Sequence, residues 1–265
     1  MGKITPDLLA LYTGIPSLSN STVDNEVNYF CAYNFPAVVS RLGRDRWPEI
    51  RPTYLTLTKD TKFKVRRTLA YSIHDIAAIL GTTITEKDLI SSFDIFLRDL
   101  DQVRVGVISN LGKFLRVLGT ELRIRYLETI KDIQRESDQN WRFRELLAMQ
   151  MPFLSSLYPK KELATEVVPI LLGLCRDRIA TVRHIAVKSI GYFLLELRED
   201  DTFSELLQEI HLFALSETFM ERQLYAIFQL SKLTPNLDSF SSANLCEPLF
   251  LVISLNMTSF LCWPL

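Results

Sequence analysis

DTKFKVRRTLAYSIHDIAAIL, running from Asp60 to Leu80, carries the pattern that decides the fold of this chain. From Val65, apolar residues recur at steps of 0, 4, 8, 11 and 15, which places them on one face of an α-helix. Asp60 in the polar run before them is placed to accept hydrogen bonds from the free N–H groups that open the helix. The members of the stripe are Val65, Leu69, Ile73, Ile76 and Leu80.

The same stripe occurs at a nearly constant spacing along the chain. Its starts lie at 27, 65, 103, 143 and 182, separated by 38, 38, 40 and 39 residues. A shorter stripe at steps 0, 4 and 7 starts at 50, 89, 167, 206 and 245, and its member near 128 is displaced by about one residue to Leu127, Ile130 and Ile133. Two alternating helices with one fixed period indicate a repeat solenoid, because the helices of an ordinary bundle have no reason to repeat their apolar stripes at a constant spacing.

We therefore predict an all-α fold, an α-solenoid of antiparallel helix pairs with about five repeats plus an incomplete sixth. One solenoid is expected over residues 1–253, and a non-repeat apolar tail over 254–265. The stripe at 245 is not followed by an acid and a Val-Arg, so we expect the chain to be a truncated or mis-spliced product. Because an exposed apolar tail promotes association, deletion of 254–265 should improve the solubility of the chain. Second helices are expected near 26–43, 64–80, 102–118, 140–158, 181–197 and 219–234.

A short polar turn joins the two helices of a pair, and an Asp leads an Arg by five or six residues in each. Each Arg can meet an Asp of its own or the neighbouring repeat, which predicts a ladder of charge-assisted pairs. Its expected members are Asp60, Arg66, Asp99, Arg104, Asp138, Arg144, Asp177 and Arg183.

Equivalent turns should line up along one ridge of a solenoid. The ridge is expected to comprise 60–64, 99–102, 137–141 and 177–181, and Phe63 and Trp141 are its large aromatic residues. Each aromatic is either packed against the next repeat or offered to a partner, where aromatic residues supply much of the binding energy.

Composition and motifs give no sign of catalysis. Thirty basic and 31 acidic residues leave a net charge of −1, which selects neither nucleic acid nor an anionic membrane. The three histidines and four cysteines form no catalytic or zinc-binding motif, and no glycine-rich phosphate loop occurs. We expect no catalytic, cofactor or metal site. The basic run of residues 59–67 is interpreted as a solvated turn, because it includes Asp60.

Targeting signals are equally weak. The first residues lack the apolar core of a signal peptide, and 245–265 is too interrupted by polar residues and proline to span a membrane. The expected location is the cytoplasm, the nucleus or both.

Helices of this period with Asp and Arg at these places look like HEAT repeats. The run CAYNFPAVVSRLGRDRWPEIRPTYLTLTKDTKFKVRRTLAYSIHDIAAILG, together with FLRDLDQVRVGV and NWRFRELLA, resembles the family of regulatory subunit 1 of serine/threonine protein phosphatase 4. The turns are more loosely similar to those of the scaffold (A) subunit of protein phosphatase 2A. Members of the family are much longer than this chain.

The resemblance implies a non-catalytic subunit that holds a phosphatase catalytic subunit and directs it to substrates, with other regulatory subunits as further partners. In phosphatase scaffold subunits, which this chain resembles, aromatic residues in these turns can contact bound subunits. Two alternatives stay open. One is a HEAT-repeat carrier of the nuclear-transport type, and the other is a HEAT-like DNA glycosylase, against which the near-neutral charge argues.

Overall fold

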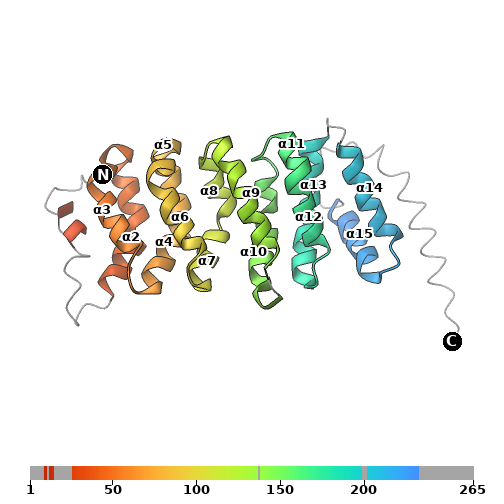
Figure 1. Cartoon of the computed structure of the whole chain (residues 1–265), viewed down its shortest axis with the longest axis horizontal. Coiled ribbons are helices and arrows are strands. Elements are labelled where there is room, and N and C mark those ends of the chain that lie inside the picture. Colours follow the sequence, from red (N-terminus) through yellow and green to blue (C-terminus); the bar gives the residue numbers. More distant parts are fainter. Residues whose placement is uncertain (1–8, 11, 15–25, 137, 199–201, 233–265) are drawn as a thin grey trace.

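The computed structural model describes residues 26–136, 138–198 and 202–232, together with 9, 10 and 12–14. All regular elements in these residues are helices, and they pack side by side into an elongated stack (Figure 1). The stripe at 245 and the tail at 254–265 lie outside the described residues. In the part that is described, no helix combines the length and the apolar character needed to cross a membrane.

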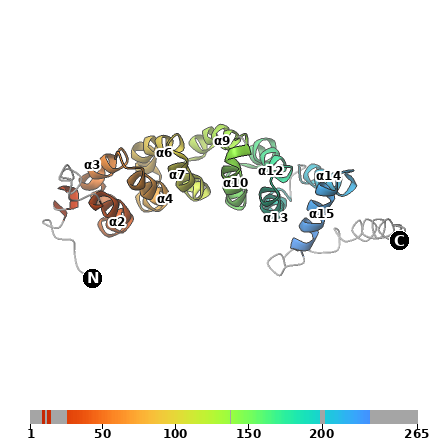
Figure 2. The ribbon, with the colours of Figure 1, turned by 90° about the horizontal axis from the view of Figure 1, so that it is seen from below.

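The helices form two layers, and the stack bends so that the second helices lie on the inner side of the arc (Figure 2). The outer layer holds α3 (Trp47–Leu57), α5 (Thr82–Ile84) with α6 (Ile90–Leu97), α9 (Thr120–Gln134), α11 (Lys160–Glu162) with α12 (Val168–Cys175), and α14 (Thr202–Leu215). The inner layer holds α2 (Val27–Leu42), α4 (Phe63–Leu80), α7 (Asp101–Ile108), α8 (Leu111–Val117), α10 (Trp141–Leu154), α13 (Ala180–Leu197) and α15 (Phe219–Lys232). Single π-helical turns, Thr85–Leu89 and Leu163–Val167, join α5 to α6 and α11 to α12, and 3₁₀ turns occupy Arg44–Arg46 and Asp138–Asn140.

The apolar stripes form the core. All five residues of the stripe that starts at Val65 are buried, and so are all five of each stripe that starts at 103, 143 and 182. Inner helices contact their neighbours in the order α2, α4, α7 with α8, α10, α13 and α15, so each stripe is covered by the adjacent pairs. The displaced outer residues Leu127, Ile130 and Ile133 are buried as well.

The first inner helix departs from the expected stripe. Val27 and Val38 are only half-buried, whereas Asn28 and Val39 are buried in their place. The buried face of α2 keeps Cys31, Phe35 and Leu42 of the stripe, and the amide of Asn28 donates to Asp60 in the following turn at 2.7 Å.

The helix expected near 102–118 is wrong as one element, because α7 and α8 are separated at Ser109 and Asn110. The buried side chain of Gln150 in α10 replaces the helical hydrogen bonds at this break. Its Nε2 donates to the carbonyl oxygen of Ser109 at 2.8 Å, and its Oε1 accepts from the N–H of Gly112 at 3.1 Å. Backbone groups freed by the break thus remain paired inside the stack.

Two glycines let the inner helices approach closely. A Cβ atom on Gly106 in α7 would lie 2.9 Å from the backbone nitrogen of Tyr71 in α4, and one on Gly112 in α8 would lie 2.5 Å from Cβ of Phe153 in α10. Neither position has room for a side chain without movement of the adjacent helix.

The helix expected at 140–158 is shorter, because α10 ends at Leu154. Pro159 disfavours a helical conformation of Tyr158, so the helix cannot continue through that residue, and α10 ends four residues before it. Tyr158, the last member of the expected stripe, is nevertheless buried.

Candidate functional site: the ridge of turns

The turns that join outer to inner helices lie along one edge of the stack, the lower edge in Figure 1. We call this edge the turn ridge. It comprises the described residues of 58–62, 98–100, 135–140, 176–179 and 216–218, together with Phe63 and Trp141, the first residues of α4 and α10.

Arg66 and Asp99 form the first of the ion pairs along the turn ridge. Nε and Nη2 of Arg66 donate to the two carboxylate oxygens of Asp99 at 2.6 and 2.8 Å. Nη1 of the same guanidinium donates to the carbonyl oxygens of Asp60 and Thr61 in its own turn, at 2.7 and 3.2 Å. Arg66 therefore closes its own turn and binds the next one. We call such a contact between an inner-helix residue and the acid of the next turn a cross-turn pair.

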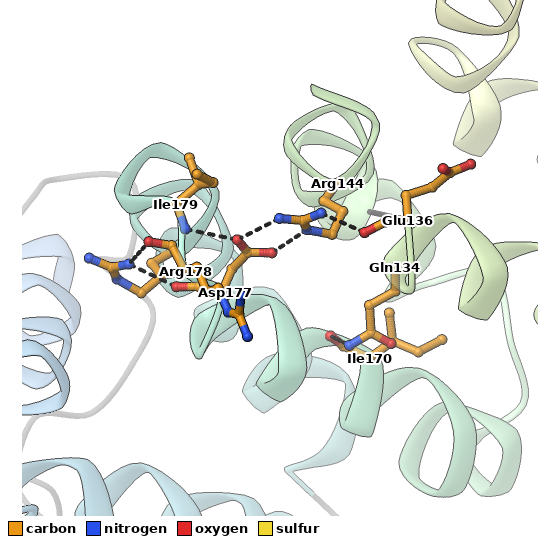
Figure 3. A network of polar contacts seen from close by, with 8 residues as sticks. Gln134, Glu136, Arg144, Ile170, Asp177, Arg178 and Ile179 are labelled. Atoms are coloured by element: carbon orange, nitrogen blue, oxygen red, sulfur yellow. Dashed lines mark hydrogen bonds and ion pairs between the residues drawn. The ribbon is translucent and has the colours of Figure 1, made fainter. Parts of the chain in front are cut away.

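Arg144 and Asp177 form the most buried cross-turn pair, with side chains only 5% and 7% exposed. Their two hydrogen bonds measure 2.5 and 3.1 Å (Figure 3). The carboxylate also accepts the N–H of Ile179 at 2.9 Å, and Arg144 donates to the carbonyl oxygen of Glu136 at 2.6 Å. Opposed charges with both partners this fully hydrogen-bonded are stable in a low-dielectric environment.

Arg104 does not pair with Asp99, which Arg66 already occupies. Its Nη2 donates to Glu136, one turn further along, and its Nη1 lies 3.7 Å from Asp101. The guanidinium also stacks over the ring of Phe143 at 4.2 Å. The expected ladder partner in this turn, Asp138, begins a 3₁₀ turn, and its side chain lies outside the described part of the chain.

Two members of the ladder have other partners. The carboxylate of Asp60 accepts hydrogen bonds from the side-chain amide of Asn28 and from the backbone N–H of Lys62. Because Asn28 is uncharged, its contact with Asp60 takes the place of an ion pair between α2 and the first turn. Arg183 donates to the carbonyl oxygens of Asp177 and Arg178 in its own turn.

Two of the ridge carboxylates have lowered pKa values. The hydrogen bonds from Arg66 lower the pKa of Asp99, against the opposing effect of burial. Burial raises the pKa of Glu136, but the hydrogen bonds from Arg104 and Asn140 and the charges of Arg104 and Arg144 outweigh it, so the net direction is down. Both groups are therefore ionised at neutral pH, as the cross-turn pairs require.

Phe63 and Trp141 do not stand free on the turns. Each is the first residue of an inner helix, α4 or α10, and each is half-buried against the core. Trp141 also has the guanidinium of Arg142 at 5.7 Å from its ring centre. Part of each ring is thus used in local packing, and the remainder is accessible at the turn ridge.

Leu100 is the apolar ridge residue that the sequence reasoning missed. It is 54% exposed and lies between α6 and α7, next to Asp99. An open cavity of about 380 Å³ is lined by Asp94, Ile95, Arg98 and Asp99. The signal was present in the sequence, because a Leu inside a polar turn is as anomalous as an aromatic residue.

The described residues show no assembly of reactive groups on the turn ridge. Nowhere among them do three His, Cys, Asp or Glu side chains come together as metal ligands do. His74 lies beside Asp75 at 3.2 Å, while His184 and His211 belong to α13 and α14. The turn ridge is thus a row of charged pairs with apolar residues between them.

The sequence of this chain matches one family model and several known proteins. The family model of the protein phosphatase 4 regulatory subunit 1 middle domain matches residues 31–133. Serine/threonine-protein phosphatase 4 regulatory subunit 1 of Rattus norvegicus is 42% identical over 193 residues, covering 71% of this chain and 20% of the rat protein. The protein of the same name from Homo sapiens is 42% identical over 177 residues, covering 66% of this chain and 19% of the human protein.

The match to the family model runs from within α2 to within α9 and includes the cross-turn pair of Arg66 and Asp99. The chain spans about a fifth of the length of the curated relatives it matches.

Proposed function

Because this chain is a relative of regulatory subunit 1 of protein phosphatase 4, as its sequence indicated, we propose that it is a regulatory subunit without catalytic activity of its own. In this proposal it binds the catalytic subunit of a type 4 serine/threonine phosphatase and directs it to substrates. The observation that carries the proposal is the 42% identity to proteins named as regulatory subunits, over 71% of the chain.

The proposal includes the type of fold. The described helix pairs, with an Asp or Glu and an Arg repeated in the turns, support a HEAT-type α-solenoid of about five repeats with an incomplete sixth, within residues 1–253. A solenoid of this kind binds partners over an extended surface while each repeat contacts only its neighbours. Proposed locations are the cytoplasm and the nucleus, which fractionation of cells that express the tagged chain would test.

The turn ridge is the proposed docking surface for the catalytic subunit. Its carboxylates and guanidiniums largely neutralise one another, so the residues left to bind a partner are the apolar ones: Leu100, and the accessible parts of Phe63 and Trp141. Apolar side chains with polar groups around them match the apolar centre and polar rim of a protein interface.

Affinity purification tests both parts of the proposal. The tagged chain is expressed in cells, and the proteins bound to it are identified by mass spectrometry. A phosphatase catalytic subunit is the expected partner. Transport factors in its place would instead support a carrier, and nucleic acid with glycosylase activity would support an enzyme.

The double variant Phe63→Ala, Trp141→Ala then tests the ridge. Recovery of the catalytic subunit should fall at least tenfold, with the circular-dichroism spectrum retained. A matched double variant, Tyr33→Ala, Tyr192→Ala, removes two exposed aromatic residues from the inner helices α2 and α13, away from the turns. Unchanged binding by the first pair, or equal losses for the two pairs, excludes the turn ridge as the docking surface.

A further inference from the structure

Two of the cross-turn pairs, Arg66 with Asp99 and Arg144 with Asp177, share one geometry. Arg66 reaches Asp99 and Arg144 reaches Asp177, and in both pairs the acid lies 33 residues after the arginine. The arginine also donates from Nη1 to a carbonyl oxygen of its own turn. The acid in turn accepts a backbone N–H of its own turn, from Leu100 at 2.7 Å or from Ile179 at 2.9 Å.

Ser216 occupies the position of the acid in the last described turn, between α14 and α15. It lies 33 residues after Arg183 in the sequence. Its Oγ accepts the N–H of Thr218, two residues on, at 3.1 Å, as Asp177 accepts that of Ile179. Its carbonyl oxygen accepts from Nη1 of Arg222 at 2.8 Å, six residues on, as the carbonyl oxygen of Asp177 accepts from Arg183.

Arg183 is placed like the arginine of a cross-turn pair, but the next turn has Ser216 where the two pairs described above have an aspartate. The residue is 9% exposed, and its Nη1 donates to the carbonyl oxygens of Asp177 and Arg178 at 2.7 and 2.9 Å. Its buried Nε has no hydrogen-bond partner among the described residues. In Arg66 and Arg144, this same atom donates to the carboxylate of the next turn, whereas Arg104, whose buried Nε also has no partner among the described residues, reaches Glu136 through Nη2. A buried cation without a counter-charge is unfavourable, so the site is suited to an anion.

We propose that Ser216 is a phosphorylation site, and that its phosphoryl group completes a cross-turn pair with Arg183. The reaction requires a protein kinase and ATP. The Ser216 Oγ forms a bond to the γ-phosphorus of ATP, the bond from that phosphorus to the bridging oxygen breaks, the hydroxyl proton passes to the kinase's base, and ADP leaves. The product carries a charge of about −2 and three acceptor oxygens, in the position that a carboxylate holds in the earlier turns.

The surroundings of Ser216 fit this role. Ser216 is half-buried, but Glu217 and Thr218 beside it are exposed, so a kinase can reach the turn. The phosphoryl group would also lie at the N-terminal end of α15, where the helix dipole favours negative charge. Phosphorylation thereby ties α13 to the α14–α15 pair and stiffens this end of the stack. The inference concerns the stack itself and does not rest on the proposed phosphatase partner.

The test uses the full 265-residue chain with phosphoserine incorporated at position 216, with Arg183 present or changed by Arg183→Gln. With Arg183, phosphoserine should raise the Tm by about 2–4 °C relative to the unmodified chain. In the Arg183→Gln chain, the rise should be less than half as large. Phosphoserine at Ser204, exposed in the first turn of α14, is the control, and its effect should not depend on Arg183. No rise at 216, or equal rises with and without Arg183, overturns the proposal.

A second measurement does not depend on how strongly Arg183→Gln itself destabilises the chain. The phosphorus NMR signal of phosphoserine 216 is followed against pH. Contact with Arg183 stabilises the dianion and should bring its second pKa below the ordinary value of about 6, whereas the Arg183→Gln chain should show a higher value. The same pKa in both chains would mean that the phosphoryl group does not contact Arg183.

Discussion

Arg144 in α10 and Asp177, in the turn before α13, are joined by two hydrogen bonds of 2.5 and 3.1 Å across two successive helix pairs. Contacts of this kind connect neighbouring turns, whereas the apolar stripes connect neighbouring helices. The edge of the stack is therefore held by charge and its interior by packing, and the two contributions can be measured separately.

Arg144→Met should lower the free energy of unfolding by about 3 kcal/mol, because it leaves the carboxylate of Asp177 buried without its counter-charge. Urea unfolding followed by circular dichroism measures the change. Lys188→Ala, at an exposed position of α13, is the control and should change stability by no more than about 0.5 kcal/mol. Similar effects for the two variants would show that the pair contributes little.

Arg104→Ala should destabilise the chain by about 1–3 kcal/mol, since the change removes both the pair with Glu136 and the contact with the Phe143 ring. Lys113→Ala, at an exposed residue of α8, should have a negligible effect. A double-mutant cycle with Glu136→Gln should give a coupling energy of at least about 0.5 kcal/mol. Strictly additive effects would contradict a direct interaction between Arg104 and Glu136.

Acid should weaken the Asp99 pair in a defined pH range. The pKa of Asp99 in the folded chain lies below its ordinary value. The contribution of ionised Asp99 to the free energy of unfolding is therefore fully present above the unfolded pKa of about 3.9, and it is lost as the pH falls through the pKa of the folded chain. Urea unfolding between pH 3 and pH 7 should thus show a constant difference between the native chain and Asp99→Asn above about pH 5. The difference should shrink below about pH 4. A difference that stays the same down to pH 3 is the contrary result.

Gly106→Ala should cost about 1–3 kcal/mol, because the new methyl group meets the backbone of α4 and the two inner helices have to separate. Thermal unfolding provides the measurement. Gly119→Ala is the matched change, since its Cβ atom would meet only the flexible carboxylate of Glu86, at 3.1 Å. If the Gly106→Ala and Gly119→Ala chains unfold at the same temperature, α4 and α7 are not in close contact in solution.

Leu100→Glu tests the exposed apolar residue of the turn ridge. Because Leu100 is 54% exposed, the change should leave the Tm within about 2 °C of the native value. It should nevertheless reduce co-purification of a phosphatase catalytic subunit at least tenfold, since it puts an unpaired charge into the proposed interface. Leu212→Glu, at a similarly exposed residue of α14, is the control and should leave binding unchanged.

Much of this architecture follows from local periodicity alone. The stripes that start at Val65, at 103, at 143 and at 182 are buried throughout, because the spacing of apolar residues on a helix decides which face is removed from water. The turns follow in the same way, since a short polar run with an acid interrupts the apolar periodicity before each stripe, and the arginine follows within the first turn of the helix. Resemblance to a known family was also readable from the sequence, and the 42% identity confirms it.

Only the tertiary structure decided which groups meet. Asp99 pairs with Arg66 rather than with the Arg104 of its own turn, and Arg104 takes Glu136 in place of an aspartate. These partners lie 32 or 33 residues apart, so their contact depends on the rotation between successive helix pairs, which no local spacing encodes. The break between α7 and α8 is non-local for the same reason, because the amide that stabilises it comes from Gln150 in the next pair.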